Sequence, residues 1–121
     1  MTVTPSQNDV ISRLLDVSML RHKVVSQNIA NVNTPAYQHQ EVAFEDALQE
    51  ALSRGKMPKD FHELQATVEN SDRPAVRADG NNVDIDKELG LLGKNATFYE
   101  TFTQVLATNN AMMRSAITGR H

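Results

Sequence analysis

The chain of 121 residues contains no cysteine and no tryptophan, and only two tyrosines and four phenylalanines. Without cysteine, neither a disulfide bond nor a thiolate metal site can form. So few aromatic side chains cannot build a large aromatic core. The length suffices for one domain, or for two helical segments joined by a connector.

Long apolar runs are also lacking. No stretch approaches the roughly 20 apolar residues that a membrane-spanning helix needs, and Met1–Pro5 lacks the basic start and apolar core of a cleavable signal peptide. We therefore expect no membrane insertion. If the protein leaves the cytoplasm, we expect a route that does not use such a signal.

The net charge of −3 is unevenly distributed. Residues 1–40 carry three Lys/Arg against two Asp/Glu, residues 41–83 carry five against nine, and residues 84–121 carry four of each sign. The ends are near neutral and the middle is acidic. Because no basic stripe is present, the sequence gives no indication of nucleic acid binding or of an anionic membrane surface.

The first third of the chain has the apolar spacing of one long amphipathic helix that ends near Asn31. We expect Thr4 to cap it, with Pro5 in the first helical position and Gln7 completing a capping box. Two apolar rows lie side by side on this helix. Together they form an apolar stripe that is wider than contact with one partner helix needs, which indicates more than one neighbour. The rows are Ile11, Leu15, Ser18, His22, Val25, Ile29 and Val32, beside Val10, Leu14, Val17 and Val24.

The end of this helix is marked by Thr34-Pro35. Proline lacks an N–H and pushes the preceding residue out of the α region, so the helix cannot continue through it. Asn31 and Asn33 have short polar side chains that can bond the backbone groups left open there. The stretch therefore predicts that the helix ends here and that the chain leaves it in one fixed direction.

The middle of the chain has little regular patterning. Glu41–Phe44 alternates weakly, as a short extended piece does, and Phe44–Arg54 predicts a brief helix closed by Gly55. Residues 56–83 lack periodicity and contain two prolines and the turn Asp79-Gly80-Asn81. We expect an irregular connector here, with little β structure.

A second long helix is predicted from Asp84, a natural N-cap with acidic residues in the turn that follows. Its apolar positions recur at steps of four and three over more than four heptads, which predicts a coiled-coil seam. We expect this seam to be an interface. Its members are Ile85, Leu89, Leu92, Tyr99, Leu106, Met113 and Ile117, with Ala96, Thr103 and Asn110 between them.

Two stretches carry a resemblance to a known family. The pattern Asn28-Ile29-Ala30-Asn31, followed by Thr34-Pro35 and Tyr37, resembles the signature of bacterial flagellar axial proteins, which build the rod and hook. The run Asp79–Glu88, with Asn95 and Tyr99 and the ending Arg114-x-Ala116-Ile117, is closer to the proximal rod proteins. The chain is thus similar to the bacterial flagellar basal body rod protein family over both helical ends, about half its length.

One residue departs from the family pattern. The family usually has glycine after the proline, whereas this chain has Ala36. A type II turn needs positive φ at that place, so we expect a type I or more open turn here.

The resemblance implies a mainly α fold in which two long terminal helices pair as a coiled-coil-like domain. We expect residues 1–34 and 84–121 to form its two helices, and residues 35–83 to form a turn, a short helix and an acidic connector. The residues that match the motif, and would serve assembly, are Asn28, Ile29, Ala30, Asn31, Thr34, Pro35 and Tyr37.

The resemblance also implies a structural subunit of the proximal rod that polymerises through its terminal helices, transmits torque and encloses the export channel. Expected partners are other rod proteins, further copies of the chain, the MS ring, the rod–ring adaptor and the export apparatus. Export would use the flagellar type III apparatus, and the protein would reside in the rod that spans the periplasm. A sibling rod or hook protein is the nearer alternative.

Enzymatic activity has little support in the sequence, and we expect neither cofactor nor metal. Asp84, Asp86 and Glu88 could suggest a calcium loop, but the sixth and twelfth positions of that loop would be Leu89 and Asn95 instead of glycine and glutamate. Acidic residues at a helix start explain them better. A small acidic metal-binding module or hydrolase remains the more distant alternative.

Overall fold

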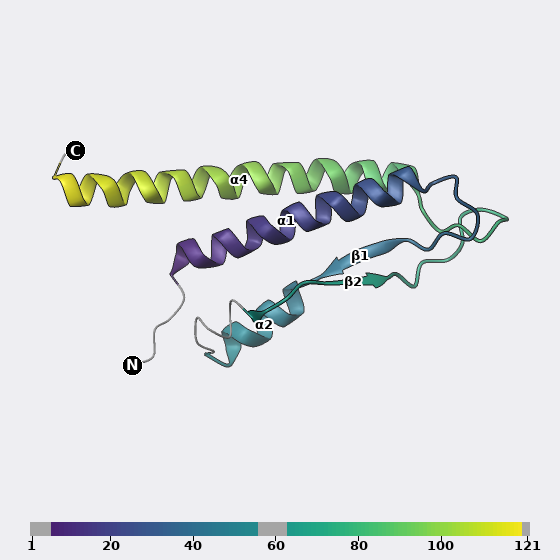
Figure 1. Ribbon diagram of the computed structural model, residues 1–121, viewed down its shortest axis with the longest axis horizontal. Helices are drawn as coiled ribbons and strands as arrows, with labels where there is room; N and C mark the ends of the chain where they lie inside the picture. Colours follow the sequence, from purple (N-terminus) through teal and green to yellow (C-terminus); the bar gives the residue numbers. More distant parts are fainter. Residues whose placement is uncertain (1–5, 56–62, 120–121) are drawn as a thin grey trace.

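The computed structural model of the chain describes residues 6–55 and 63–119, and within them the fold is mainly α. Its elements are α1 (Gln7–Ala30), β1 (Gln40–Ala43), α2 (Glu45–Ser53), β2 (Thr67–Asn70) and α4 (Ile85–Thr118). Helices α1 and α4 lie side by side and antiparallel, and a slimmer arm of β1, β2 and α2 runs along the other side of α1 (Figure 1). The predicted pairing of two long terminal helices is confirmed.

Helix α1 begins two residues later than the sequence predicted. Its N-cap is Ser6, whose hydroxyl accepts from the Asp9 amide at 3.2 Å while the Asp9 carboxylate accepts from the Ser6 amide at 2.9 Å. Asp9 replaces the usual Glu or Gln of a capping box. The prediction of a cap at Thr4 is therefore wrong for this helix, and Thr4 and Pro5 themselves lie outside the described residues.

Helix α4 begins as predicted. The Asp84 carboxylate accepts from the amides of Asp86 at 3.1 Å and Lys87 at 3.4 Å, and Asp86 and Glu88 lie at the positive end of the helix. The helix ends before Gly119, which has the left-handed conformation common at helix ends, with φ of 65°. The side chain of Asn8, in the first turn of α1, bonds Asn109 and Asn110, so the last two turns of α4 extend past α1 (Figure 1).

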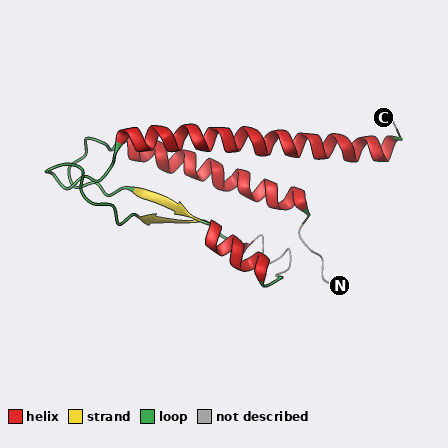
Figure 2. Ribbon diagram, turned by 180° about the vertical axis from the view of Figure 1, so that it is seen from behind, coloured by secondary structure: helices red, strands yellow, loops and turns green. Residues whose placement is uncertain are grey.

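The arm is more ordered than the sequence predicted. Strand β2 pairs antiparallel with β1, from Gln40 opposite Asn70 to Ala43 opposite Thr67, which Figure 2 shows in yellow. All four β2 residues are exposed, so no alternation of apolar side chains indicated the strand. The expected short helix is present as α2, and Gly55 with φ of 60° follows it. Part of the predicted connector, residues 56–62, lies outside the described residues.

The buried apolar side chains lie mostly along α1, because this helix is the middle layer between α4 and the arm (Figure 2). The double apolar row predicted more than one neighbour, and α1 contacts both α4 and β1. The buried apolar residues are Ile11, Val17, Val24, Val25, Phe44, Ala51 and Val83.

The turn after Pro35 differs from the sequence prediction. Ala36 has φ of 58°, the only positive φ of a non-glycine residue in the described parts of the chain. Its amide donates to the carbonyl of Asp79 at 3.1 Å. This hydrogen bond, made with Ala36 in the left-handed conformation, joins the turn after Pro35 to the loop that precedes α4. The family's glycine would adopt this conformation without strain, and the alanine here adopts it despite its Cβ.

We therefore expect Ala36→Gly to stabilise the fold. Relief of the left-handed conformation is worth about 1–2 kcal/mol, and the added freedom of the unfolded chain opposes it by about 0.4–1 kcal/mol. Urea unfolding followed by circular dichroism should show a net gain on the order of 0.5–1 kcal/mol. The matched change Ala107→Gly, at an exposed helical position, should lose about 1 kcal/mol. Equal losses in both variants would contradict the assigned backbone conformation.

Candidate functional site

Asn28 connects the end of α1 to the start of the arm. Its side chain is fully buried and bonds the backbone of Gln40 at two points, donating to the carbonyl at 2.8 Å and accepting from the amide at 3.0 Å. The Tyr37 hydroxyl donates to the same amide oxygen at 3.2 Å. Asn28 thus behaves as an extra strand residue beside β1, which fixes the place where the arm leaves the helix.

Asn81 closes the end of α1 from the other side. Its amide nitrogen donates to the carbonyls of Asn31 at 3.0 Å, Val32 at 3.1 Å and Thr34 at 2.8 Å. Its amide oxygen accepts from the Val83 amide at 2.8 Å. Carbonyl groups at the end of a helix have no hydrogen-bond partner within the helix. Around the end of α1, a residue about fifty positions away in the chain donates the missing hydrogen bonds.

Residues of the predicted assembly motif therefore hold the turn that follows α1 in one conformation. Asn28, Asn31, Thr34 and Tyr37 share in the hydrogen bonds, since Asn31 also donates to Gln27 and accepts from the Thr34 hydroxyl. The other motif residues make no side-chain hydrogen bonds: Ile29 is half-buried, and Ala30 and Pro35 are exposed. A direct role of the motif in assembly stays a prediction.

Glu88 is the most connected buried residue on α4. Its side chain has no exposure and lies 2.7 Å from the His39 Nε2 and 3.4 Å from the Arg73 guanidinium. Asn28 donates to its second oxygen at 3.1 Å, and the other His39 ring nitrogen contacts the Ser71 hydroxyl at 2.8 Å. The carboxylate therefore joins α1, β1, the segment after β2 and α4.

The sequence did not predict this cluster. Glu88 was interpreted only as an acidic residue at a helix start, and His39 has no neighbour in the sequence that marks it as a partner. The signal that could have found it is spacing, because Glu88 lies one heptad before another buried polar residue, Asn95. Burial, and then the negative charge of Glu88, raises the pKa of the nearby Tyr37 phenol, which keeps it a hydrogen-bond donor.

Chemically, the cluster holds the fold together. Its carboxylate is enclosed and has a partner on each oxygen, so no oxygen faces an open site. Across residues 6–55 and 63–119, no group of three His, Cys, Asp or Glu side chains is placed to hold a metal ion. In the same residues no helix has the length and apolar character to cross a membrane.

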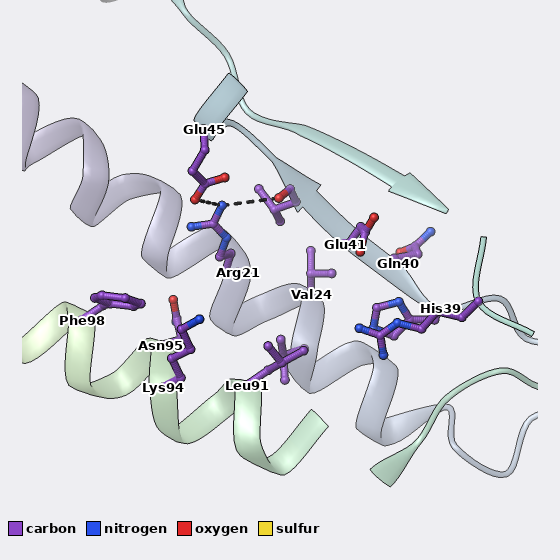
Figure 3. A pocket seen from close by; sticks show the side chains of 13 residues that line it. Arg21, Val24, His39, Gln40, Glu41, Glu45, Leu91, Lys94, Asn95 and Phe98 are labelled. Atoms are coloured by element: carbon purple, nitrogen blue, oxygen red, sulfur yellow. Dashed lines mark hydrogen bonds and ion pairs between the residues drawn. The ribbon is translucent and has the colours of Figure 1, made fainter. Parts of the chain in front are cut away.

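A groove of about 280 Å³ lies beside this cluster, with α1 as its floor and β1 and α4 as its walls (Figure 3). Arg21 on the floor bonds Glu45 and the Val42 carbonyl. Burial alone would raise the pKa of Glu45, but the hydrogen bond from Arg21 and its positive charge lower it overall. On the opposite wall, Lys94 lies over the ring of Phe98. The groove is an open surface feature whose walls combine charged and apolar side chains.

The face of α4 that contacts α1 is largely polar. Every seventh residue from Glu88 points inward, and Asn95 bonds Ser18 twice: its amide donates to the Ser18 carbonyl at 2.8 Å and its oxygen accepts from the Ser18 hydroxyl at 2.9 Å. One heptad further, Phe102 is half-buried, and Asn109 donates to Asn8 at 3.1 Å. These bonds fix the register of the two helices.

The predicted seam consequently lies beside this face. Leu92 and Leu106 are half-buried, while the remaining five members are exposed: Ile85 by 37%, Leu89 by 52%, Tyr99 by 40%, Met113 by 56% and Ile117 by 80%. The structure brings them together as one line on α4 and leaves most of that line uncovered by the described residues. Its role as an interface between chains is not decided by this arrangement.

We expect Asn81→Asp to destabilise the fold by roughly 2–4 kcal/mol, because a carboxylate would replace the donor that faces three carbonyl oxygens. Urea unfolding near neutral pH measures the loss. Asn33→Asp is the matched control, since the exposed Asn33 uses its oxygen to accept from Arg77 at 2.7 Å and aspartate keeps that acceptor. A loss at Asn81 no larger than at Asn33 would refute the capping role.

Comparison with known proteins agrees with this architecture. No protein-family model matches the chain. It is 37% identical to the flagellar basal body rod protein FlgB of Borrelia hermsii, over 82% of this chain and 86% of that protein. It is 29% identical to FlgB of Bacillus subtilis, over 83% and 84%, and 26% identical to FlgB of Salmonella typhimurium, over 87% and 88%. With identity above 30% over most of both chains in the first comparison, the chain belongs to the family of flagellar basal body rod proteins FlgB.

Proposed function

We propose that this chain is a structural subunit of the proximal rod in the flagellar basal body, and that it polymerises through its terminal helices. The names of its relatives support the location. The observation that carries the mode of assembly is the long line of exposed apolar side chains on α4. Burying one such side chain is worth about 1.5–3 kcal/mol, so contacts between chains along this line would be strongly favourable.

The free end of α4 adds to this argument. The last two turns of the helix extend beyond α1 and carry Met112, Met113 and Ile117, each more than half exposed. A helical end without an apolar neighbour is marginal in water. A neighbouring subunit that packs against it would stabilise the helix and lengthen the assembly.

The helix pair suits a part that carries mechanical load. Hydrogen bonds at both ends and in the middle of the α1–α4 contact resist sliding of one helix past the other. Repeated around a tube, such pairs would transmit torque and enclose the export channel. The chain would act there as a building block and not as an enzyme: its most buried titratable side chains, Glu88 and His39, lie 2.7 Å apart inside the fold, and Asn28 donates to the Glu88 carboxylate.

We also propose an export route and a set of binding partners for the chain. The chain has no cysteine, so no disulfide would hinder unfolding during export through the flagellar type III apparatus. In the rod it would contact other rod proteins, further copies of itself, the MS ring, the rod–ring adaptor and the export apparatus. These contacts would place it in the basal body rod that spans the periplasm.

We expect Leu89→Asp to abolish motility and rod assembly in cells whose own gene for this protein is deleted. Leu89 is half exposed, so a carboxylate is tolerated by the free chain but would be buried without a partner in the assembly. Gln104→Asp is the matched control, an exposed change on the polar side of the same helix. Swimming assays and electron microscopy of isolated basal bodies give the readout, and immunoblots confirm equal protein levels.

Two results would contradict the proposal. Wild-type motility in the Leu89→Asp strain would show that the apolar line is not an interface. Wild-type motility in cells that lack the gene altogether would remove the rod function itself.

A further inference from the structure

Helix α4 carries two exposed apolar strips, one on each side of the face that contacts α1. We call the first the isoleucine strip: Ile85, Leu89, Leu92, Ala96 and Tyr99. We call the second the phenylalanine strip: Leu91, Phe98, Val105 and Met112. At 3.6 residues per turn the two strips lie roughly 120° apart around the helix. A single partner placed on one side of α4 cannot cover both.

The two strips have edges of opposite charge. Lys87 and Lys94 lie along the outer edge of the phenylalanine strip, and Lys94 extends over the Phe98 ring with its nitrogen 5.8 Å from the ring centre. Asp86 and Glu100 lie along the outer edge of the isoleucine strip. Arg114 lies on the same line along α4 as Asp86 and Glu100. It belongs to the free end of the helix, past α1, and not to the part that carries the acidic edge.

The surroundings of the strips also differ in shape. Leu91, Lys94 and Phe98 form one wall of the groove on α1, so the start of the phenylalanine strip borders a hollow (Figure 3). The isoleucine strip is not part of that groove's lining. The isoleucine strip of one chain could therefore pack along the border of this groove on another chain.

We propose that a second copy of this chain occupies each strip, with the isoleucine strip of one copy packed against the phenylalanine strip of the next. This inference rests on the proposed function and goes further by assigning which surface meets which. Pairing unlike strips brings the acidic edge to the basic edge, whereas pairing like strips opposes lysine to lysine or carboxylate to carboxylate.

The consequence is an interface of the head-to-tail kind. After the first contact, one copy keeps its phenylalanine strip free and the other its isoleucine strip, so addition continues until a ring closes or a helical array forms. A symmetric dimer, in which the same patch serves both partners, would stop growth after one step. The placement of two unlike strips on one helix therefore favours an open or cyclic assembly.

The test uses single cysteine substitutions, because the chain has no cysteine of its own. One set lies on the isoleucine strip or its continuation (Leu89→Cys, Ala96→Cys, Thr103→Cys), and the other on the phenylalanine strip (Leu91→Cys, Val105→Cys, Met112→Cys). The first set covers residues 89–103 and the second residues 91–112, so pairs are opposed over a range of axial offsets. Variants that keep motility are expressed singly or in pairs in cells lacking the native gene, treated with a flexible bis-maleimide, and analysed by immunoblot.

We expect cross-linked dimers only in cells that express one variant from each set, and a ladder of multimers from a chain that carries both cysteines. Dimers formed by a single variant, or by two variants of one set, would overturn the proposal and leave the rod function intact. Motile cells with no cross-link between copies in any combination would also overturn it, because other proteins would then cover the strips. Full motility without the gene is a separate result and refutes the rod function.

Charge reversal gives an independent readout. We expect Lys94→Glu and Glu100→Lys each to reduce the mixed cross-link at least several-fold and the double variant to restore it. The two residues lie six positions apart and about 120° from each other around α4, too far for contact within one helix, so restoration must act between copies. Lys23→Glu, an exposed change on α1, should leave the cross-link unchanged. Additive losses in the double variant would overturn the pairing of unlike edges.

Discussion

The buried carboxylate of Glu88 is the interaction on which the remaining structure depends. A carboxylate removed from water is strongly unfavourable unless charged and hydrogen-bonding partners surround it. Here Asn28 comes from α1, His39 precedes β1 and Arg73 follows β2. Because these residues belong to three separate segments, the carboxylate is satisfied only when the helix pair and the arm are assembled together.

This constraint explains how α4 distributes its side chains. The inward line of the helix uses Glu88, Asn95 and Asn109 to bond α1 and the arm, so much of its apolar content lies on the two sides of that line. A polar inward face sets register and direction but buries little apolar surface. The apolar sides stay largely uncovered by the described residues, a distribution that suits the proposed role as a subunit of a polymer.

The sequence predicted those features that depend on neighbouring residues. Asp84 and Gly55 mark helix ends through backbone chemistry that acts over one turn, and both are confirmed. Features that depend on distant partners were not predictable in the same way. Asn81 caps α1 from about fifty residues away, and β2 forms because β1 lies beside it.

Two features of the structure depart from what local sequence patterns indicate. Apolar periodicity locates the apolar line of a helix, and on α4 that line lies beside the face that contacts α1, because three of the four inward positions from Glu88 to Asn109 are polar. Ala36 was expected at negative φ from its residue type, but its bond to Asp79 requires positive φ. At Ala36 and on α4, hydrogen bonds to residues distant in the chain outweigh the conformation or packing that the local sequence favours.

The most direct test of the role of Glu88 is a pair of distance measurements by double electron–electron resonance. Nitroxide labels at Glu69→Cys and Thr101→Cys report the distance from the arm to α4, and labels at Ser12→Cys and Thr101→Cys report that from α1 to α4. With Glu88 in place, both distances should be single and narrow. In Glu88→Leu the arm distance should broaden and shift while the helix-pair distance stays narrow, because the bonds of Asn95 and Asn109 remain. An unchanged arm distance in Glu88→Leu would contradict the account.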